Sequence, residues 1–333
     1  QYFKYARSHT MKKVQEIRTL RKLKNDYVDK LILEYSINGR IYAQFNATAR
    51  DEIDGSRIGT RTGRFSSSKP NLQQVPKRDK NLAPIIRAFF VPDQGKHWAK
   101  LDYSQQEPRI LVHYAVLMDF PGARDALRAY KRDKGLDYYK YVGDVANLER
   151  KPAKDLTLGI FYGEGIWKIA NDLNMDINDA KELKDGFEDK NPYVILLYRS
   201  AMRRANKNGF IRTILGRKRR FNLYEPVNSF ELRNSGIDTT PTSLEECPNR
   251  WPTCDYKRAF TYKALNALIQ GSAADMTKAA MLKVWRDMGL APHMQVHDEL
   301  NYSVTDMEEA LAIQHCMEHC VDIKTPMLAD LDY

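Results

Sequence analysis

The stretch HWAKLDYSQQEPRILVHYAVL, residues 97–117, changes its pattern midway and decides the fold. Its first part, HWAKLDYS, reads as an apolar strand that ends close to Asp102. The second part, from Gln106 onward, carries apolar residues at helical spacing. The sequence therefore predicts a strand that delivers a carboxylate directly before a helix begins.

A second carboxylate is expected in a similarly rigid place. Residues 293–304, HMQVHDELNYSV, alternate apolar and polar residues on both sides of His297 and Asp298, which predicts a strand, a tight turn and a strand. Strand ends and turns can hold carboxylates facing one cleft, and such oxygens suit Mg²⁺. The alternative is that Asp102 and Asp298 are ordinary cap and turn residues.

The stretch RKPAKDLTLGIFYG, residues 150–163, predicts a helix with a chemically distinct face. Pro152 is tolerated only in a first turn, so the helix should begin near Lys151. Two cations at a helix N-terminus favour a triphosphate, and apolar residues further along would face a base and sugar. An amphipathic surface helix is the alternative. Four residues spaced by four share the face: Arg150, Lys154, Leu158 and Tyr162.

The rest of the chain reads as mixed structure, without internal repeats. The expected elements are a helix at 8–35 with a basic face, loop or short strand at 55–76, helices across 122–207, a strand ending in a basic turn at 209–221, an insertion or long surface loop at 222–258, and helices at 259–287 and 306–323.

Composition narrows the functional class. The chain has 333 residues with 53 Lys and Arg against 43 Asp and Glu, and this net charge of +10 fits a polyanionic partner such as nucleic acid. No apolar run approaches the roughly 18–20 residues of a membrane helix. Four cysteines and the absence of a signal-peptide pattern favour a reducing, cytoplasmic location, and the first residue, Gln1, suggests a start inside a longer chain.

Five segments together resemble the DNA polymerase I family, family A, in its polymerase region. They occur in the family's order from about Leu20 to Leu300. The segments are RTGRFSSSKPNLQQVP at 61–76, LDYSQQEPRI at 101–110 (motif A), RKPAKDLTLGIFYG at 150–163 (motif B), NALIQGSAAD at 266–275 and QVHDEL at 295–300 (motif C).

The resemblance implies an α+β right-hand polymerase fold, with an antiparallel-sheet palm, helical fingers and a partial helical thumb. The implied divisions are the thumb at 1–54, the first part of the palm at 55–118, the fingers at 119–221, the insertion at 222–258 and the second part of the palm at 259–333.

The resemblance also implies roles for individual residues. Asp102, Asp298 and the Tyr103 carbonyl would bind two Mg²⁺ ions, for which Mn²⁺ can substitute, with Glu299 in support. Lys154 would act in catalysis as well as binding. The implied nucleotide contacts are Arg150, Lys154, Leu158, Tyr162, Gln106 and Glu107, the last excluding a ribose 2′-hydroxyl. The implied DNA contacts are Arg64, Gln73, Asn266, Gln270, Arg109 and His297.

The activity implied is DNA-directed DNA synthesis for replication or repair. A primer 3′-hydroxyl would attack the α-phosphate of a deoxynucleotide, with two metal ions assisting and pyrophosphate leaving. The helix at 150–163 would swing inward over a correct base pair. The expected partners are primer–template DNA and deoxynucleoside triphosphates, with accessory replication proteins as further candidates. A monomer is expected, located in the host cytoplasm if the source is a bacteriophage or virus.

The chain departs from the family pattern at several positions. Leu158 stands where the family usually has Phe or Tyr, and Tyr262 where it usually has Arg. Gln106 and Pro108 also depart from it, and they are expected to bend the start of the helix. The basic run 217–220 is expected near template phosphates, with a solvated turn as the alternative.

Three other interpretations compete with a DNA polymerase. A single-subunit RNA polymerase shares the palm, but Glu107 would obstruct a ribose 2′-hydroxyl. A non-catalytic protein that binds primed DNA would not need both Asp102 and Asp298. A metal-dependent hydrolase would need a positioned water and would not need the helix at 150–163. A local zinc site at Cys247 and Cys254, or in HCMEHC at 315–320, is also conceivable, but its spacing matches no common zinc module.

Overall fold

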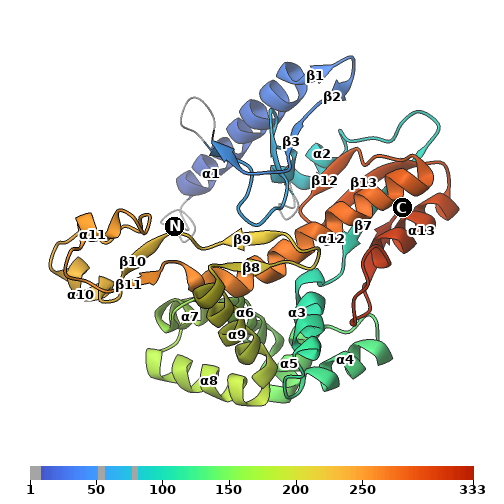
Figure 1. Ribbon diagram of the computed structural model, residues 1–333. Helices are drawn as coiled ribbons and strands as arrows, with labels where there is room; N and C mark the ends of the chain where they lie inside the picture. Colours follow the sequence, from blue (N-terminus) through green and yellow to red (C-terminus); the bar gives the residue numbers. More distant parts are fainter. Residues whose placement is uncertain (1–8, 52–56, 77–81) are drawn as a thin grey trace. The chain divides into compact units, whose positions relative to one another are not determined.

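Helices and short antiparallel strands alternate along the chain, and the computed structural model describes residues 9–51, 57–76 and 82–333 (Figure 1). Residue 8 of the expected first helix and residues 55 and 56 of the expected loop lie outside these ranges. The chain divides into two units. The first unit is 1–100 with 292–309 and residue 333, and the second is 101–291 with 310–332.

The first unit combines one long helix with small antiparallel pairs of strands. The helix expected at 8–35 is confirmed as α1 (His9–Lys22), which continues as the π-helix η2 (Leu23–Glu34). The other elements are β1 (Ser36–Ile37), β2 (Arg40–Ile41), β3 (Gln44–Asn46), β4 (Arg50–Asp51), β5 (Arg57–Ile58), β6 (Ser66–Ser68), η3 (Leu72–Gln74), α2 (Leu82–Arg87), β12 (Met294–Val296) and β13 (Glu299–Val304).

The core of the first unit forms around the second half of this helix. Tyr27 and Leu31 are buried against Leu72, Ile86 and Met294, which come from η3, α2 and β12. Such burial stabilises by about 1.5–3 kcal/mol for each large side chain. The apolar stripe of the first half behaves differently: Ile17 is 49% exposed and Leu20 is 55% exposed.

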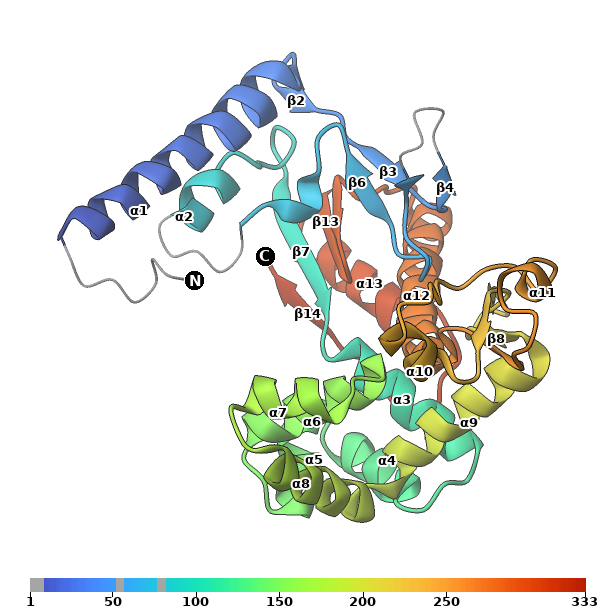
Figure 2. The same ribbon diagram turned by 90° about the vertical axis from the view of Figure 1, so that its left-hand side faces the viewer.

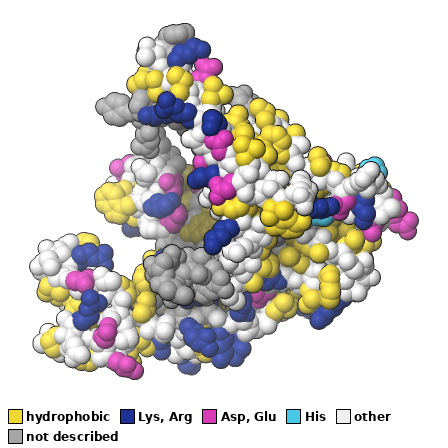
Figure 3. All heavy atoms as spheres, turned by 90° about the horizontal axis from the view of Figure 1, so that it is seen from above, with side chains coloured by type: hydrophobic (Ala, Val, Ile, Leu, Met, Phe, Trp, Pro, Cys, Tyr) yellow, Lys and Arg dark blue, Asp and Glu magenta, His cyan; other side chains and the backbone are white. Residues whose placement is uncertain are grey.

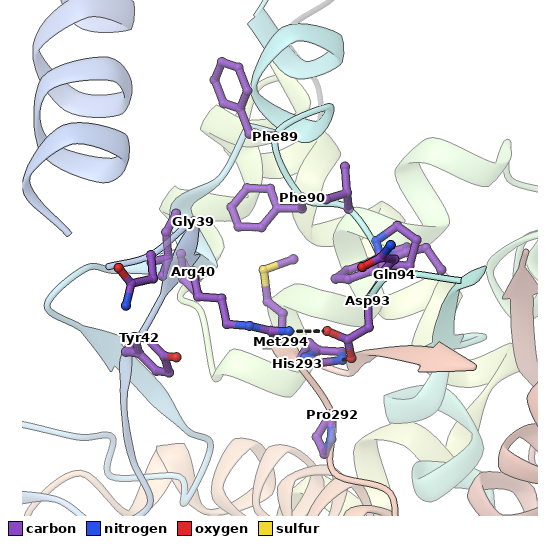
Figure 4. A pocket seen from close by; sticks show the side chains of 16 residues that line it. Gly39, Arg40, Tyr42, Phe89, Phe90, Asp93, Gln94, Pro292, His293 and Met294 are labelled. Carbon is purple, nitrogen blue, oxygen red and sulfur yellow. Dashed lines mark hydrogen bonds and ion pairs between the residues drawn. The ribbon is translucent and has the colours of Figure 1, made fainter. Parts of the chain in front are cut away.

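An ion pair spans a hollow of about 510 Å³ in the first unit (Figure 4). Arg40, on the β1–β2 hairpin, lies 2.6 Å from Asp93, and His293 Nε2 lies 3.2 Å from the other Asp93 oxygen. The hydrogen bond from Arg40 lowers the pKa of Asp93. Phe90 and Met294 point into the hollow, so apolar side chains lie beside this charge pair.

The second unit is mainly helical, and its helices α3–α9 gather together in both views (Figures 1 and 2). Its helices are α3 (Gln106–Leu117), α4 (Ala123–Arg132), α5 (Tyr138–Ala146), α6 (Arg150–Tyr162), α7 (Ile166–Leu173), α8 (Ile177–Lys190), α9 (Pro192–Asn208), α10 (Ser229–Asn234), α11 (Cys247–Arg250), η4 (Thr261–Lys263) and α12 (Ala264–Met288), with most of α13 (Met307–Glu318).

One four-stranded sheet has the order β12-β13-β7-β14. Strand β7 (His97–Tyr103) begins in the first unit and ends in the second, and β14 (Ala329–Asp332) was not expected from the sequence. The predicted hairpin at 293–304 is confirmed, with Met294 paired to Asn301 and Val296 to Glu299. The predicted strand before Asp102 and the helix after it are also confirmed.

Two predictions about the region after α9 are wrong, the basic turn and the long loop, whereas the insertion at 222–258 stays a prediction. Residues 209–221 form an antiparallel hairpin, β8 (Phe210–Arg212) and β9 (Lys218–Arg220), so most of the basic run lies in a strand rather than a turn. Residues 222–258 contain β10 (Tyr224–Pro226), paired with β11 (Tyr256–Arg258), as well as α10 and α11. This segment packs around buried Trp251, whose indole donates to the Asp238 carbonyl.

The surface that Figure 3 presents carries Lys and Arg side chains interspersed with acidic and apolar ones. The excess of positive charge is therefore not collected in one place on that face. Among the described residues, no helix is both long and apolar enough to cross a membrane.

Arg217, the first residue of the basic run, is directed into the second unit. Its Nε lies 2.9 Å from Asp275 of α12, and its Nη2 donates to the Gly271 carbonyl. The Asp275 side chain is only 7% exposed, and Arg217 is the cation that forms an ion pair with this buried carboxylate.

We predict that Arg217→Ala destabilises the second unit, because it leaves the buried Asp275 without its cation. A loss of about 2 kcal/mol would lower the melting temperature by about 4–8 °C. Lys218→Ala removes a neighbouring exposed cation and serves as the control in thermal unfolding followed by circular dichroism. Equal melting temperatures for the two variants would contradict the prediction.

Candidate nucleotide and nucleic-acid site

Helix α6 has one buried and one accessible face, as its sequence predicts. It extends from Arg150 to Tyr162, with Pro152 in its first turn. The buried face packs through Ala153, Leu156, Thr157, Ile160 and Phe161, whereas the four residues spaced by four from Arg150 to Tyr162 are exposed or half-buried. The helix ends at Gly163, which has φ +65°; a Cβ there would lie 2.6 Å from the Tyr262 carbonyl.

The two cations at the start of α6 share one aromatic ring. The Arg150 guanidinium lies 6.0 Å and the Lys154 ammonium 5.7 Å from the centre of the Tyr139 ring. A ring face attracts cations at such distances, so Tyr139 helps to hold both near each other. Burial, with the Glu107 carboxylate, raises the pKa of Tyr139, so it remains a neutral phenol.

Arg150 also has an acidic partner, Asp137. Its Nε lies 2.5 Å from one Asp137 oxygen, and the other oxygen caps α5 by accepting from the Tyr139 and Lys140 amides. Burial raises the pKa of Asp137, but the bonds from Arg150 and the amides outweigh it, and the net pKa is lowered. In this conformation any other anion that bonds to Arg150 Nε would have to displace Asp137.

The far end of α6 meets α12. Gln270 Nε2 lies 3.4 Å from the Tyr162 hydroxyl, which brings together two residues that the sequence analysis assigned to base and minor groove. Asn266 lies one turn earlier on α12 and is half-buried like Gln270. Tyr262, which replaces the family's usual Arg, is 40% exposed and packs against Gly163.

The turn after β7 is held firmly. Asp102 is half-buried at the strand's end, and Tyr103 beside it is buried, with its hydroxyl donating to the Met317 carbonyl at 2.7 Å. The Ser104 amide bonds to Leu328, and Gln105 adopts a left-handed conformation with φ +50°. Glu107, half-buried, lies in the first turn of α3.

Two assignments in motif A need correction. Arg109 is fully buried and donates to the carbonyls of Ser104, Pro326 and Lys134, so it cannot contact DNA in this structure. Gln106 is 3% exposed and donates to the Ala273 carbonyl of α12, so it does not face a nucleotide. Both side chains hold α3 in place.

Other candidate residues lie in the first unit. Gln73 Nε2 donates to Gln295 at 2.8 Å and to the Phe65 carbonyl, while Gln295 in turn bonds to the His297 carbonyl. His297 and Asp298 form the turn between β12 and β13, where His297 has φ +59°. Arg64 is half-buried in the segment before β6.

The carboxylates assigned to metal binding divide between the units. Asp102 belongs to the second unit, whereas Asp298 and Glu299 belong to the first. Glu299 is 1% exposed and accepts from Asn301 Nδ2 at 3.1 Å. No three His, Cys, Asp or Glu side chains in the described ranges form a metal-binding group. The carboxylate and carbonyl oxygens of Asp102, Asp298 and Tyr103 are nevertheless the donor type that Mg²⁺ prefers.

Three residues around these positions were missed by the sequence analysis. Asp137 precedes a helical run, which is a visible signal for an N-cap, but its bond to Arg150 had no signal. Tyr139 had none either, because its contact with α6 is tertiary. Gln295 lies within motif C, yet only the structure pairs it with Gln73.

Comparison with known proteins gives a consistent result over the whole chain. The profile described as DNA polymerase family A matches residues 2–333. The chain is 33% identical to a DNA-directed DNA polymerase of Pseudomonas phage M6, covering 96% of this chain and 50% of that protein. It is 30% identical to the thermostable DNA polymerase I of Thermus thermophilus, covering 95% and 35% respectively.

A solved structure agrees. The POL domain of Pol1 from M. smegmatis, in complex with DNA primer-template and dNTP, matches with a TM-score of 0.73 and 28% identity over 97% of this chain and 52% of that one. The chain spans about half the length of the phage polymerases it matches, at 50% and 51%. With its mixed helices and antiparallel strands in the α+β polymerase fold, the chain belongs to DNA polymerase family A.

Proposed function

We propose that this chain catalyses template-directed DNA synthesis, adding deoxynucleotides to a primer 3′-hydroxyl with release of pyrophosphate. The observation that carries the proposal is the accessible face of α6. It presents Arg150 and Lys154 at one end and Tyr162, bonded to Gln270 of α12, at the other. That arrangement suits a triphosphate at the helix N-terminus and a base at its end.

The chain's own residues would bind and orient the reactants. Arg150 and Lys154 would hold the triphosphate, and Tyr162 would lie beside the template base. Glu107 would exclude a ribose 2′-hydroxyl. Gln73, Asn266 and Gln270 carry amides that can donate to purine N3 and pyrimidine O2 in the minor groove, which every base pair presents.

Divalent metal ions would complete the site. Asp102, Asp298 and the Tyr103 carbonyl would hold Mg²⁺, with Glu299 in support. When bound, the ions would increase the acidity of the primer hydroxyl and neutralise charge on the leaving pyrophosphate. The division of the chain into thumb, palm, fingers and insertion remains part of this proposal.

Primer extension tests the proposed activity. Primed template with Mg²⁺ should be extended with deoxynucleotides and not with ribonucleotides, and EDTA should abolish the reaction until Mg²⁺ is restored. Asp298→Ala should lower the rate by at least about 100-fold, since a metal site contributes several kcal/mol. Glu182→Ala, which removes an exposed carboxylate of α8, is the control. Equal extension with ribonucleotides would instead favour an RNA polymerase.

Release of Arg150 should strengthen nucleotide binding. We predict that Asp137→Asn, which retains a side chain able to cap α5, lowers the KM for deoxynucleotides about two- to fivefold, because an exposed ion pair contributes about 0.2–1 kcal/mol. Asp144→Asn on the same helix is the matched control. An unchanged KM in Asp137→Asn, measured by steady-state extension, would show that Arg150 does not need to leave Asp137.

Leu158 should affect the handling of sugar analogues. It is half-buried on the accessible face of α6 and lacks the flat ring that family A usually has there. We predict that the wild-type chain rejects dideoxynucleotides more strongly than Leu158→Phe does. Termination ladders at matched dideoxynucleotide ratios measure this, and equal termination by both proteins would refute it.

A further inference from the structure

A second hollow, of about 460 Å³, lies within the second unit. It is enclosed by α3, α9, β8 and α12, and none of the residues assigned to synthesis above lines it. Its volume falls within the range of about 300–1,000 Å³ typical of small-ligand sites. Its lining includes Tyr114, Leu197, Ser200, Arg204, Arg212 and Leu268.

The floor of this hollow is apolar and well packed. Leu197 and Ala201 of α9, Ile211 of β8 and Leu268 of α12 are each no more than 5% exposed. These side chains offer a dry surface suited to a flat, weakly polar group. A nucleobase is such a group, because both its faces are apolar while its edges carry hydrogen-bonding atoms.

The rim of the hollow is basic. Arg204 is exposed beside the apolar floor, and it forms no hydrogen bond or ion pair with any residue that the structure describes. Arg212 donates only to the Gly216 carbonyl among these residues and lies 5.4 Å from the centre of the Phe210 ring. Neither guanidinium has a carboxylate partner within the described ranges. Both are therefore available to an anion, and guanidinium matches phosphate well.

Neutral polar groups complete the lining. The side-chain amide of Asn208, at the end of α9, has no bonded partner in the part of the chain described here, so it can both donate and accept. The Ser200 hydroxyl donates only to the Met118 sulfur, a weak acceptor. An amide and a hydroxyl beside an apolar floor can bond to the edge of a base.

More positive charge flanks the hollow. Arg203 and Lys207 on α9, and Lys218 on β9, are exposed and form no ion pair with a described carboxylate. This concentration of unneutralised cations favours a polyanion over a small monoanion. A chain of nucleotides supplies both the bases and the repeated phosphates.

We propose that this pocket binds one nucleotide of single-stranded DNA, with the base over the apolar floor and its phosphate between Arg204 and Arg212. The pocket would thus be a second nucleic-acid contact, separate from the minor-groove residues. A duplex cannot use it, because paired and stacked bases do not present a free face.

A nucleotide bound in this pocket would contact α12. Leu268 lies two residues from both Asn266 and Gln270, so it projects from the opposite side of that helix. The Tyr114 hydroxyl, in the same lining, bonds to Ser272 of α12 at 2.9 Å. The pocket therefore contacts the back of the helix whose front carries two proposed primer–template contacts.

Fluorescence anisotropy with a labelled oligodeoxythymidylate of about 12 nucleotides tests the proposal. Arg204→Ala/Arg212→Ala should weaken binding about five- to tenfold and reduce the salt dependence by about 0.7 in log–log slope for each phosphate that is no longer bound. The control is Arg203→Ala/Lys207→Ala, which removes two cations of the same surface outside the pocket. Blunt duplex should bind both variants equally.

Abasic DNA tests the role of the base. The same oligonucleotide made entirely of abasic sites should bind the wild type about tenfold more weakly, since the apolar floor would lose the base that it buries. The Arg204→Ala/Arg212→Ala variant should bind it more weakly than the wild type does, because abasic DNA retains the phosphates that the two guanidinium groups would contact. Equal wild-type affinity for the two oligonucleotides, or an equal decrease in both double variants, would overturn the proposal.

Competition with free thymidine monophosphate shows whether the pocket binds a nucleotide within single-stranded DNA or a free nucleotide, because both carry the same base and phosphate. Competition by it at concentrations near the Kd of the oligonucleotide would assign the pocket to free nucleotides and overturn the single-strand proposal. The proposal does not depend on DNA synthesis. Wild-type protein that binds the oligonucleotide but does not extend primers would contradict the proposed function alone, and wild-type protein that extends primers but does not bind the oligonucleotide would overturn the pocket proposal alone.

Discussion

A buried guanidinium holds together the part of the second unit on which the rest depends. Arg109 is fully buried on α3 and donates to three carbonyls, from Ser104, Lys134 and Pro326, at 2.6–2.8 Å. These acceptors belong to the turn after Asp102, the α4–α5 connection and the approach to β14. Burial lowers the pKa of Arg109, and neutral carbonyl dipoles rather than a carboxylate satisfy it. Loss of this side chain would remove three of the hydrogen bonds that link these loops. One of the three acceptors, the Ser104 carbonyl, lies two residues after Asp102, a proposed metal ligand.

The two ends of α6 are stabilised by different kinds of contact. At its start, Arg150 and Lys154 are held by the Tyr139 ring, and Arg150 also by Asp137, through electrostatic contacts that an anionic ligand could replace. At its end, Tyr162 and Gly163 contact α12 and η4 directly. An anionic ligand could therefore replace the contacts at the start of the helix, whereas its end is held by direct contacts with α12 and η4.

The sequence predicted local structure well where periodicity and chain-breaking residues agreed. Pro152 and Gly163 bound α6, and the alternation around Asp298 gave the β12–β13 hairpin. It failed where tertiary contacts decide: Arg109 looks like an exposed motif residue until its three carbonyl partners are known. The turn predicted for the basic run was wrong because residues 218–220 pair with β8 as a second strand, and Arg217 bonds to Asp275, 58 positions later. Segment 222–258 was read as a loop because its strands are only three residues long.

Gly163 has a mechanical consequence. Its backbone lies so close to the Tyr262 carbonyl that a methyl group would not fit, so this end of α6 cannot approach η4 any further. A helix of 13 residues is about 20 Å long, and a tilt of about 10° around its fixed end would displace the other end by about 3 Å. Helix α6 would then rotate about Gly163, and a small rotation there would be enough to move the Arg150 guanidinium from Asp137 to a bound triphosphate.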